Sequence, residues 1–283
     1  MIIGIVGLGL IGGSLAHGSR SVARHQVYGL DTDPGTMARA MADGVICGEL
    51  NDAALGNCEL LLLALYPQAA VDFMVRNGDR ISPGACVVDL CGVKQTVRDG
   101  ILPIAFHRGF HYVGGHPMAG REVSGYEAAH GKLFTGASML LCPEEDTPPE
   151  TLAMLEDFFL SIGFGGVTIT NPEEHDRVIA YTSQLAHVLS NAYVKSPNAL
   201  CHAQFSGGSF QDLTRVAFLH VPMWTELFML NRDHLIAEID ELCQRLATYA
   251  EALRQGDAQG LSALLQEGCD WKERIMAGKD SQA

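Results

Sequence analysis

The sequence predicts a doubly wound α/β domain followed by an all-helical domain, and three observations lead to this prediction. Short apolar runs without polar alternation recur through the first half and alternate with helical stretches. A glycine-rich turn follows the first of these runs. After Ile169 nearly every segment has the apolar spacing that is typical of helices. We therefore expect one domain over residues 1–170 and a second over residues 171–283.

The expected strands of the first domain are continuous apolar segments, as is typical of strands that helices cover on both faces. They are Ile2–Val6, Gln26–Leu30, Glu59–Leu65, Cys86–Leu90, His111–Gly114, Ser138–Cys142 and Gly166–Ile169. Helices are expected behind the first two strands, at Leu10–Arg24 and Pro34–Met41. This alternation predicts a parallel sheet with helices on each side.

The second domain begins with a strong helix start at Asn171-Pro172-Glu173-Glu174, which combines an N-cap, a first-turn proline and a capping-box glutamate. One long helical segment is expected from Pro222 to about Gln255 and a last helix from Gly260 to about Met276, joined by a turn at Gly256-Asp257. A helical domain this apolar is expected to pack against a second copy, which predicts a homodimer.

The composition restricts the class of protein. The 283 residues include 19 basic and 33 acidic side chains, which give a net charge of −14, and 47% are apolar. Such a chain is expected to fold, and to bind neither nucleic acid nor a membrane surface, because both are polyanions. No apolar run approaches the roughly 20 residues of a membrane span, and no cationic segment precedes the first apolar stretch as in a signal peptide. The 8 cysteines are scattered without a C-x-x-C pair, so we expect reduced thiols, no metal ion and a cytoplasmic protein.

The glycine-rich turn, Gly7-Leu8-Gly9-Leu10-Ile11-Gly12, lies between the first strand and the first helix, where Rossmann-type domains bind dinucleotides. Its glycines permit a tight turn, close approach to a pyrophosphate and close helix packing, while the helix N-terminus offers unpaired N–H groups. Asp31 closes the second strand, where its carboxylate suits ribose hydroxyls and would repel the 2′-phosphate of NADP. The alternative is a turn that serves only packing, with Asp31 as a helix cap. The predicted cofactor is NAD, bound by Gly7, Gly9, Leu10, Ile11, Gly12 and Asp31.

Two further segments follow strand ends, Asp89–Lys94 and Gly114–Gly120. Loops at the carboxyl ends of parallel strands are where open α/β sheets bind ligands. His116 is held there between glycines and a proline, which makes it a candidate base, although a loop histidine with a backbone partner is the alternative.

Taken together, these motifs resemble those of the prephenate dehydrogenase family, which includes the arogenate dehydrogenases of tyrosine biosynthesis. The resemblance covers essentially the whole chain, and GGHPMAG is its most specific part. It rests on GLGLIGGS (7–14), Gly92-Val93-Lys94, GGHPMAG (114–120) with Glu122 and Gly125, and DLTRV (212–216) with Trp224. The resemblance implies a nucleotide-binding domain followed by a helical dimerisation domain, and oxidative decarboxylation of a cyclohexadienol with hydride transfer to NAD.

The resemblance also implies roles for single residues. His116 would take the proton of the substrate hydroxyl, and a neutral imidazole suits that task near pH 7. Arg215 would bind a substrate carboxylate with its guanidinium fork, with an ion pair to Asp212 as the alternative. Lys94 either adds positive charge beside the substrate or pairs with Asp89. Trp224 is expected to pack at a helix start.

Two positions depart from the family pattern. Many members carry a serine before the Val-Lys pair, where it supports the catalytic histidine, but this chain has Gly92. Either another hydroxyl or a water orients His116, or the support is absent. A substrate-contacting histidine of relatives is replaced by Gln184, whose amide forms hydrogen bonds but does not titrate. His187 lies within one turn of it and is expected either to face the substrate or to belong to the core.

The predicted function is NAD-dependent conversion of prephenate to 4-hydroxyphenylpyruvate. One alternative is an arogenate dehydrogenase, whose substrate carries an amino group in place of the keto oxygen. A second is a non-catalytic NAD sensor, against which GGHPMAG and Arg215 speak. A third is a β-hydroxy acid dehydrogenase, for which Lys195 is poorly placed before Ser196-Pro197. Too few residues follow Met276 for the regulatory domain of some relatives, so any tyrosine feedback is expected at the active site.

Overall fold

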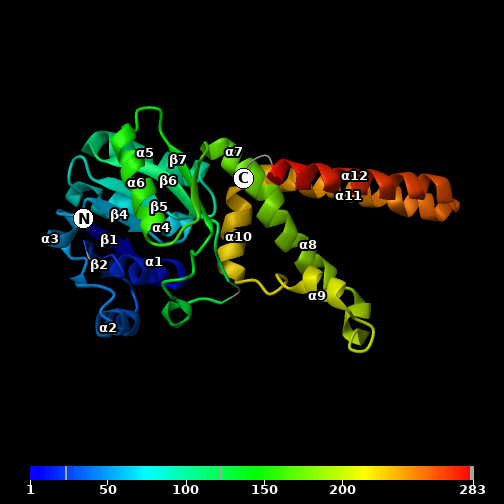
Figure 1. Ribbon diagram of the computed structural model, residues 1–283, viewed down its shortest axis with the longest axis horizontal. Coiled ribbons are helices and arrows are strands. Elements are labelled where there is room, and N and C mark those ends of the chain that lie inside the picture. The colour runs from blue at the N-terminus through cyan, green and yellow to red at the C-terminus, as the bar shows by residue number, and fades with distance from the viewer. Residues whose placement is uncertain (23, 122, 281–283) are drawn as a thin grey trace. The chain divides into compact units, whose positions relative to one another are not determined.

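The structure of the protein is a computed structural model that describes residues 1–22, 24–121 and 123–280. It contains an eight-stranded sheet with the strand order β3-β2-β1-β4-β5-β6-β7-β8 (Figure 1). The strands are β1 (Ile2–Val6), β2 (Gln26–Leu30), β3 (Gly48–Glu49), β4 (Leu60–Leu63), β5 (Cys86–Asp89), β6 (His111–Pro117), β7 (Ser138–Pro143) and β8 (Gly166–Ile169). The predicted doubly wound α/β fold class is confirmed, with β3 as a short strand that the apolar pattern does not indicate.

One strand corrects the expectation of a purely parallel sheet. β7 pairs antiparallel to β6, with His116 opposite Leu140. The connection between β6 and β7 contains only the short turn η2 (Tyr126–Ala128) in its described part, and a parallel return needs a longer crossover, usually a helix. A crossover helix follows β7, and β8 again pairs parallel to β7.

The helices up to α10 are α1 (Leu10–Arg20), α2 (Pro34–Ala42), α3 (Asp52–Leu55), α4 (Pro67–Asn77), α5 (Gln95–Arg108), α6 (Pro149–Ser161), α7 (Pro172–Ile179), α8 (Ala186–Tyr193), α9 (Gly208–Thr214) and α10 (Val221–Leu230), with the short turns η1 (Gly78–Arg80) and η4 (Pro197–Cys201) and the π-helix η3 (Ala180–Leu185). Helices α1 and α6 pack on one face of the sheet, and α4 and α5 pack on the other. α1 begins at the predicted residue and ends four residues earlier, at Arg20.

The core consists of two apolar layers, one on each face of the sheet. All four residues of β4 are fully buried. Leu60 and Leu62 join the layer that contains α1 and α6, whereas Leu61 and Leu63 join the layer that contains α4 and α5. Because successive side chains of a strand point to opposite faces, an unbroken leucine run fills both layers.

The chain divides into two compact units, one from Met1 to Arg232 and one that begins at Asp233. Helices α7 to α10 therefore belong to the same unit as the sheet. Two contacts explain this: Asp176 of α7 accepts hydrogen bonds from the main chain before α5, and Leu227 of α10 packs in the core of the sheet. The expected division at residue 170 stays a prediction.

The second unit consists of the helices α11 (Arg232–Gln255) and α12 (Ala258–Asp280). The predicted turn joins them, since Gly256 has a φ of +65° and Asp257 accepts a hydrogen bond from Gly260 N. The prediction of one continuous helix from Pro222 to Gln255 is wrong, because α10 ends at Leu230 and the helix is interrupted at Asn231 before α11 begins. No helix in the described ranges is long and apolar enough to cross a membrane.

Candidate active site

The glycine turn joins β1 to α1. Glycine is needed at its three glycine positions for different physical reasons. Gly7 has a φ of +85°, and a Cβ on Gly12 would lie 1.8 Å from the carbonyl oxygen of Gly7. The backbone conformation at Gly7 and the close contact at Gly12 therefore require glycine at these two positions, whether or not a ligand binds. A Cβ on Gly9 would meet no described atom within 4 Å. Gly9 is also the N-cap of α1 and forms no side-chain cap, so it leaves open space at a helix N-terminus, as a pyrophosphate requires.

Asp31 ties the end of β2 to this turn. Its Oδ2 accepts a hydrogen bond from Leu8 N at 2.7 Å, and its Oδ1 accepts one from Asp33 N at 2.9 Å. The N-cap of α2 is Asp33, whose carboxylate accepts hydrogen bonds from Gly35 N and Thr36 N. Asp31 is therefore not the helix cap, and its partly exposed carboxylate lies beside the glycine turn.

His116 lies near the end of β6 and is half-buried. Its Nδ1 is 2.8 Å from Nε2 of His175, on α7. Nδ1 of His175 is in turn 2.8 Å from Oδ1 of Asp176. The side chains of His175 and Asp176 are almost completely buried. The three side chains thus form a connected row that ends on a carboxylate.

Asp176 is held by the main chain at the start of α5. Lys94 N donates to its Oδ1 at 2.7 Å and Gln95 N donates to its Oδ2 at 2.9 Å. Hydrogen bonds from His175 and from these two amides lower the pKa of Asp176 despite its burial. Its carboxylate is therefore ionised at neutral pH.

The electrostatics keep His116 neutral. Burial, then His175 and Lys94, hold the pKa of His116 well below its ordinary value of 6.5. Burial also lowers the pKa of His175, although Asp176 opposes this shift. A neutral imidazole is the form that accepts a proton, so His116 has the charge state of a base.

Lys94 is enclosed within the sheet unit, and its side chain is 1% exposed. Its Nζ donates to Oδ1 of Asp89, and to the carbonyl oxygen of Gly115 at 2.6 Å. Tyr112 OH donates to the other carboxylate oxygen of Asp89 at 2.7 Å. This is the pairing with Asp89 that the sequence leaves open as an alternative, and it corrects the expectation that Lys94 contacts the substrate, because the enclosed amine is already bonded. Through its hydrogen bond to Gly115 O, Lys94 stabilises the strand β6 that carries His116.

Gln184 lies in the π-helix η3 and is 1% exposed. Asn231 Nδ2 donates to the carbonyl oxygen of Asp176 at 2.8 Å and to Oε1 of Gln184 at 2.9 Å. A carbonyl oxygen only accepts, so the Asn231 atom beside it is the nitrogen, and the Gln184 atom facing that nitrogen is Oε1. Gln184 Nε2 is left buried, with no hydrogen-bond partner in the described part of the chain. Three expected site residues, His116, Lys94 and Gln184, are therefore connected through Asp176.

Two other expected site residues lie elsewhere in this unit. His187, on α8, is 2.8 Å from Ser183 O through Nδ1, and its ring lies 3.9 Å from that of Trp224. Trp224 thus packs near the start of α10, as expected. Arg215 is exposed and follows α9, and the segment after it is held to α8 by Asn191 Nδ2, which donates to Ala217 O at 3.1 Å. Substrate binding by Arg215 and His187 stays a prediction. Glu122 of the motif lies outside the described residues.

Sequence reasoning missed His175, Asp176 and Asn231. The helix start at Asn171 is correct, since its Oδ1 accepts from Glu174 N at 2.9 Å. The missed signal is the helical spacing of His175 and Ile179, four residues apart on the buried face of α7. A histidine beside an aspartate on a buried helix face needs hydrogen-bond partners, and this indicates a cluster of buried polar side chains.

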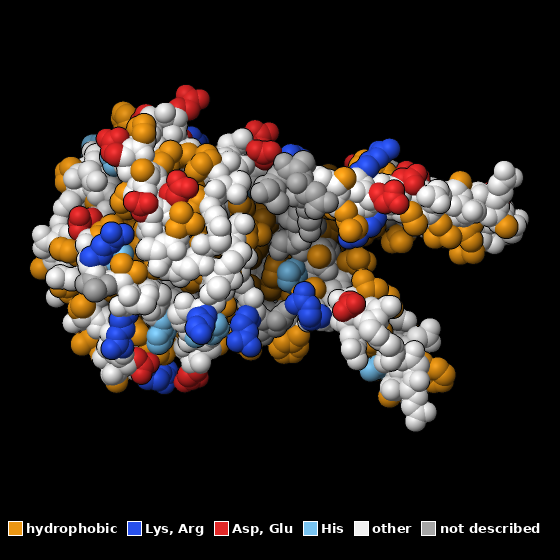
Figure 2. All heavy atoms as spheres, in the orientation of Figure 1, with side chains coloured by type: hydrophobic (Ala, Val, Ile, Leu, Met, Phe, Trp, Pro, Cys, Tyr) orange, Lys and Arg blue, Asp and Glu red, His pale blue; other side chains and the backbone are white. Residues whose placement is uncertain are grey.

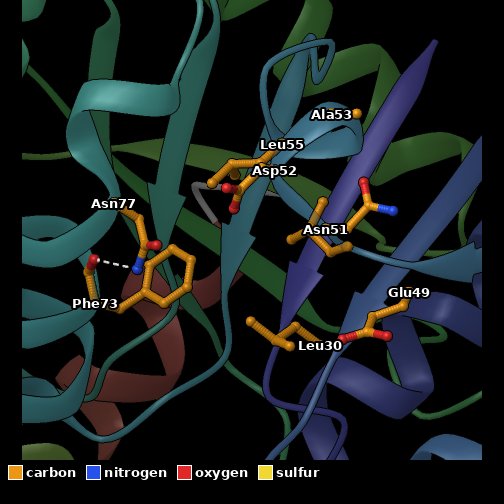
Figure 3. A pocket seen from close by; sticks show the side chains of 9 residues that line it. Leu30, Glu49, Asn51, Asp52, Ala53, Leu55, Phe73 and Asn77 are labelled. Carbon is orange, nitrogen blue, oxygen red and sulfur yellow. Dashed lines mark hydrogen bonds between the residues drawn. The ribbon is translucent and has the colours of Figure 1, made fainter.

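Two open hollows are distinct from this cluster. One, of about 490 Å³, lies between α3 and α4 and adjoins Leu30, the residue before Asp31 (Figure 3); its lining is Leu30, Glu49, Leu50, Asn51, Asp52, Ala53, Leu55, Phe73 and Asn77. The other, of about 510 Å³, lies along residues 118–121 and 130–137. Neither lining contains an expected site residue, and we assign no ligand to them.

A doubly wound sheet, a glycine turn at its first βα junction and a neutral histidine at the end of a strand define a nucleotide-dependent dehydrogenase. Comparison with known proteins agrees. Residues 16–168 match the nucleotide-binding domain of prephenate dehydrogenase, and residues 171–267 match the dimerization domain of prephenate dehydrogenase. The chain belongs to the prephenate dehydrogenase family, and the predicted family and the oxidoreductase class are confirmed.

Individual relatives are similar over most of their length. Prephenate dehydrogenase of Bacillus subtilis is 26% identical over 286 residues, which cover 96% of this chain and 75% of that protein. Cyclohexadienyl dehydrogenase of Zymomonas mobilis is 28% identical over 265 residues, 87% of this chain and 88% of that protein. The crystal structure of Aquifex aeolicus prephenate dehydrogenase in complex with hydroxyphenyl propionate and NAD+ has a TM-score of 0.81 and 27% identity, and covers 96% of this chain and 97% of that one.

Proposed function

We propose that the protein converts prephenate to 4-hydroxyphenylpyruvate with NAD+ as cofactor, a step of tyrosine biosynthesis. The observation that carries this proposal is His116, a neutral imidazole near the end of β6 whose Nδ1 is engaged by His175. Its other ring nitrogen, Nε2, is the atom that accepts the proton of the substrate hydroxyl. As that proton leaves the hydroxyl oxygen, hydride leaves the carbon that bears the hydroxyl, and carbon dioxide is lost as the ring becomes aromatic. The protein therefore has chiefly to position the reacting atoms.

NAD+ supplies the acceptor for that hydride. The residues that would hold it are the glycine turn and Asp31. Gly9 leaves room for the pyrophosphate at the N-terminus of α1, and the Asp31 carboxylate suits the ribose hydroxyls. Asp31 thereby also favours NAD over NADP, whose 2′-phosphate would meet its negative charge.

The substrate has carboxylate groups, and the protein has a net charge of −14. Positively charged or hydrogen-bond-donating side chains within the site therefore have to bind these carboxylates. Gln184 Nε2 is a buried donor, and a carboxylate or keto oxygen is the kind of acceptor that satisfies it. An ammonium group, which arogenate carries in place of the keto oxygen, only donates. Arg215 is the proposed carboxylate partner, through two parallel hydrogen bonds.

We further propose that the protein is a homodimer formed through its helical part. Helices α11 and α12 expose large apolar side chains, which Figure 2 shows in orange along this unit; they are Ile236, Leu246, Leu253, Leu265, Trp271, Ile275 and Met276. Exposed apolar surface of this extent is typical of an interface. The match of residues 171–267 to the dimerization domain of prephenate dehydrogenase supports a second copy as the partner. All eight cysteines are free, which supports a cytoplasmic location.

The decisive experiment assays purified protein with prephenate or arogenate, each with NAD+ or NADP+. We expect NADH and 4-hydroxyphenylpyruvate from prephenate with NAD+. His116→Asn is expected to lower kcat by roughly 10²–10⁴-fold with near-normal NAD+ affinity. His107→Gln, an exposed histidine of α5, is the matched control and should leave kcat unchanged. Absence of turnover with either substrate would contradict the proposed activity.

A further inference from the structure

The row of side chains from His116 to Asp176 fixes where the protons lie. The Asp176 carboxylate is ionised, so it only accepts hydrogen bonds, and His175 Nδ1 at 2.8 Å has to carry a hydrogen. A neutral His175 then has a bare Nε2. That nitrogen is 2.8 Å from His116 Nδ1, which therefore carries the hydrogen between the two rings. The remaining nitrogen of His116, Nε2, is left bare.

We propose that His175 and Asp176 are positioning residues that select this tautomer of His116 and hold its ring. The inference rests on the proposed function, in which His116 Nε2 accepts the substrate hydroxyl proton. Without an acceptor at Nδ1, His116 would be free to carry its hydrogen on Nε2, where it cannot act as a base. The support thus comes from an imidazole and a carboxylate on α7.

The same row accommodates the charge that the reaction creates. When His116 Nε2 takes up the hydroxyl proton, the ring becomes an imidazolium that donates through Nδ1 to His175. The hydrogen between the rings either stays on His116 or moves to His175 Nε2, and the total number of protons on the three groups is the same in both cases. On His116 the positive charge is one imidazole away from the Asp176 carboxylate, and on His175 it is in direct hydrogen-bond contact with that carboxylate.

If Asp176 and His175 had a purely structural role, the contact between the rings of His116 and His175 would be unexplained. Capping the start of α5 accounts for the hydrogen bonds that Asp176 accepts from Lys94 N and Gln95 N. It does not account for a contact of two ring nitrogens at 2.8 Å, which requires one hydrogen between them. At Gly92, where many family members carry a supporting serine, this chain has no side chain. In our proposal His175 takes the supporting role.

The tautomer is measured directly by the ring ¹⁵N shifts of histidine in the unliganded protein at neutral pH. We expect His116 and His175 to be protonated at Nδ1 and bare at Nε2, the reverse of the form that dominates in free histidine. His187 provides an internal reference, because its Nδ1 faces the Ser183 carbonyl oxygen, which only accepts. His116→Asn assigns the signals. A hydrogen on Nε2 of His116 would overturn the proposal even if the enzyme turns over prephenate, so this test is separate from that of the function.

Two variants of His175 test the consequence for turnover. His175→Leu removes the acceptor and should lower kcat roughly 10²-fold, within the range that a positioned base contributes, with NAD+ affinity unchanged. His175→Gln restores an acceptor oxygen for His116 Nδ1 and should keep kcat within roughly tenfold of the unmodified protein. Equal loss in both variants, or none in His175→Leu, would overturn the proposal. If His175→Leu does not fold, the ¹⁵N measurement on the unmodified protein decides.

Discussion

Lys94 and Asp89 form an ion pair that is closed off from solvent, with side chains 1% and 0% exposed. Lys94 also donates to the carbonyl oxygen of Gly115, the residue before His116. The pair therefore joins the end of β5 to the strand that carries His116. A Cβ on Gly115 would lie 2.8 Å from the Asp89 carbonyl oxygen, so only glycine lets the two strands approach this closely.

Breaking this pair is expected to destabilise the fold strongly. Lys94→Met leaves the Asp89 carboxylate buried without its counter-charge, which should lower the free energy of unfolding by about 3–5 kcal/mol. Lys94→Met combined with Asp89→Asn removes both charges and should be less destabilised than Lys94→Met alone. Urea unfolding measures both. Arg245→Met, which breaks an exposed pair with Glu241, is the control and should change little. A Lys94→Met protein as stable as the original would contradict the enclosed pair.

Asp31 is expected to set the choice of cofactor. Asp31→Ser removes the charge that repels a 2′-phosphate, so the ratio of kcat/KM for NAD+ to that for NADP+ should fall. Asp33→Ser is the matched control, because serine also caps helices and Asp33 caps α2. Steady-state kinetics with both cofactors measure the ratio. If Asp31→Ser leaves it unchanged, or Asp33→Ser lowers it equally, another residue discriminates.

The sequence predicted most of the fold because local patterns determine it. β1, β2 and β8 have the predicted bounds, since apolar runs flanked by turn residues mark buried strands. The helix break at Asn231 was missed because apolar residues recur at helical spacing on both sides of it. Its cause is tertiary: the Asn231 amide binds Asp176 and Gln184, which lie 55 and 47 residues away in the chain. His116 was predicted, but its contact with His175, 59 residues away in the chain, was not, for the same reason.

Gln184 should act on substrate affinity. Gln184→Met keeps the length of the side chain and removes the unpaired donor, so the KM for prephenate should rise roughly 10–100-fold, as expected for loss of a hydrogen bond to a charged group. The KM for NAD+ should stay unchanged. Gln184→His restores a donor and should retain more affinity than Gln184→Met. A loss of stability alone, with an unchanged KM for prephenate, would make Gln184 a structural residue.

Arg215→Ala tests the carboxylate partner. Loss of the guanidinium should mainly raise the KM for prephenate, because a carboxylate that binds equally in the ground and transition states affects KM more than kcat. Arg108→Ala, which removes an arginine paired with Asp79 at the end of α5, controls for the loss of one positive charge. If Arg215→Ala and Arg108→Ala have the same KM for prephenate, Arg215 does not bind the substrate.

The buried environment of His116 predicts where activity falls at low pH. Its pKa lies well below the ordinary 6.5, so the imidazole stays neutral through pH 6.5 and kcat/KM should fall only at lower pH. The same shift affects stability: between its lowered folded pKa and 6.5 the unfolded chain binds a proton that the folded chain does not. The free energy of unfolding is therefore not reduced by this group above pH 6.5, and it decreases as the pH falls from 6.5 toward the lowered folded pKa. Burial lowers the pKa of His175 too and adds to this loss. Rate profiles and urea unfolding from pH 5 to 8 measure both effects, and an acid limb of kcat/KM at or above pH 6.5 would show that His116 is not the neutral, buried base.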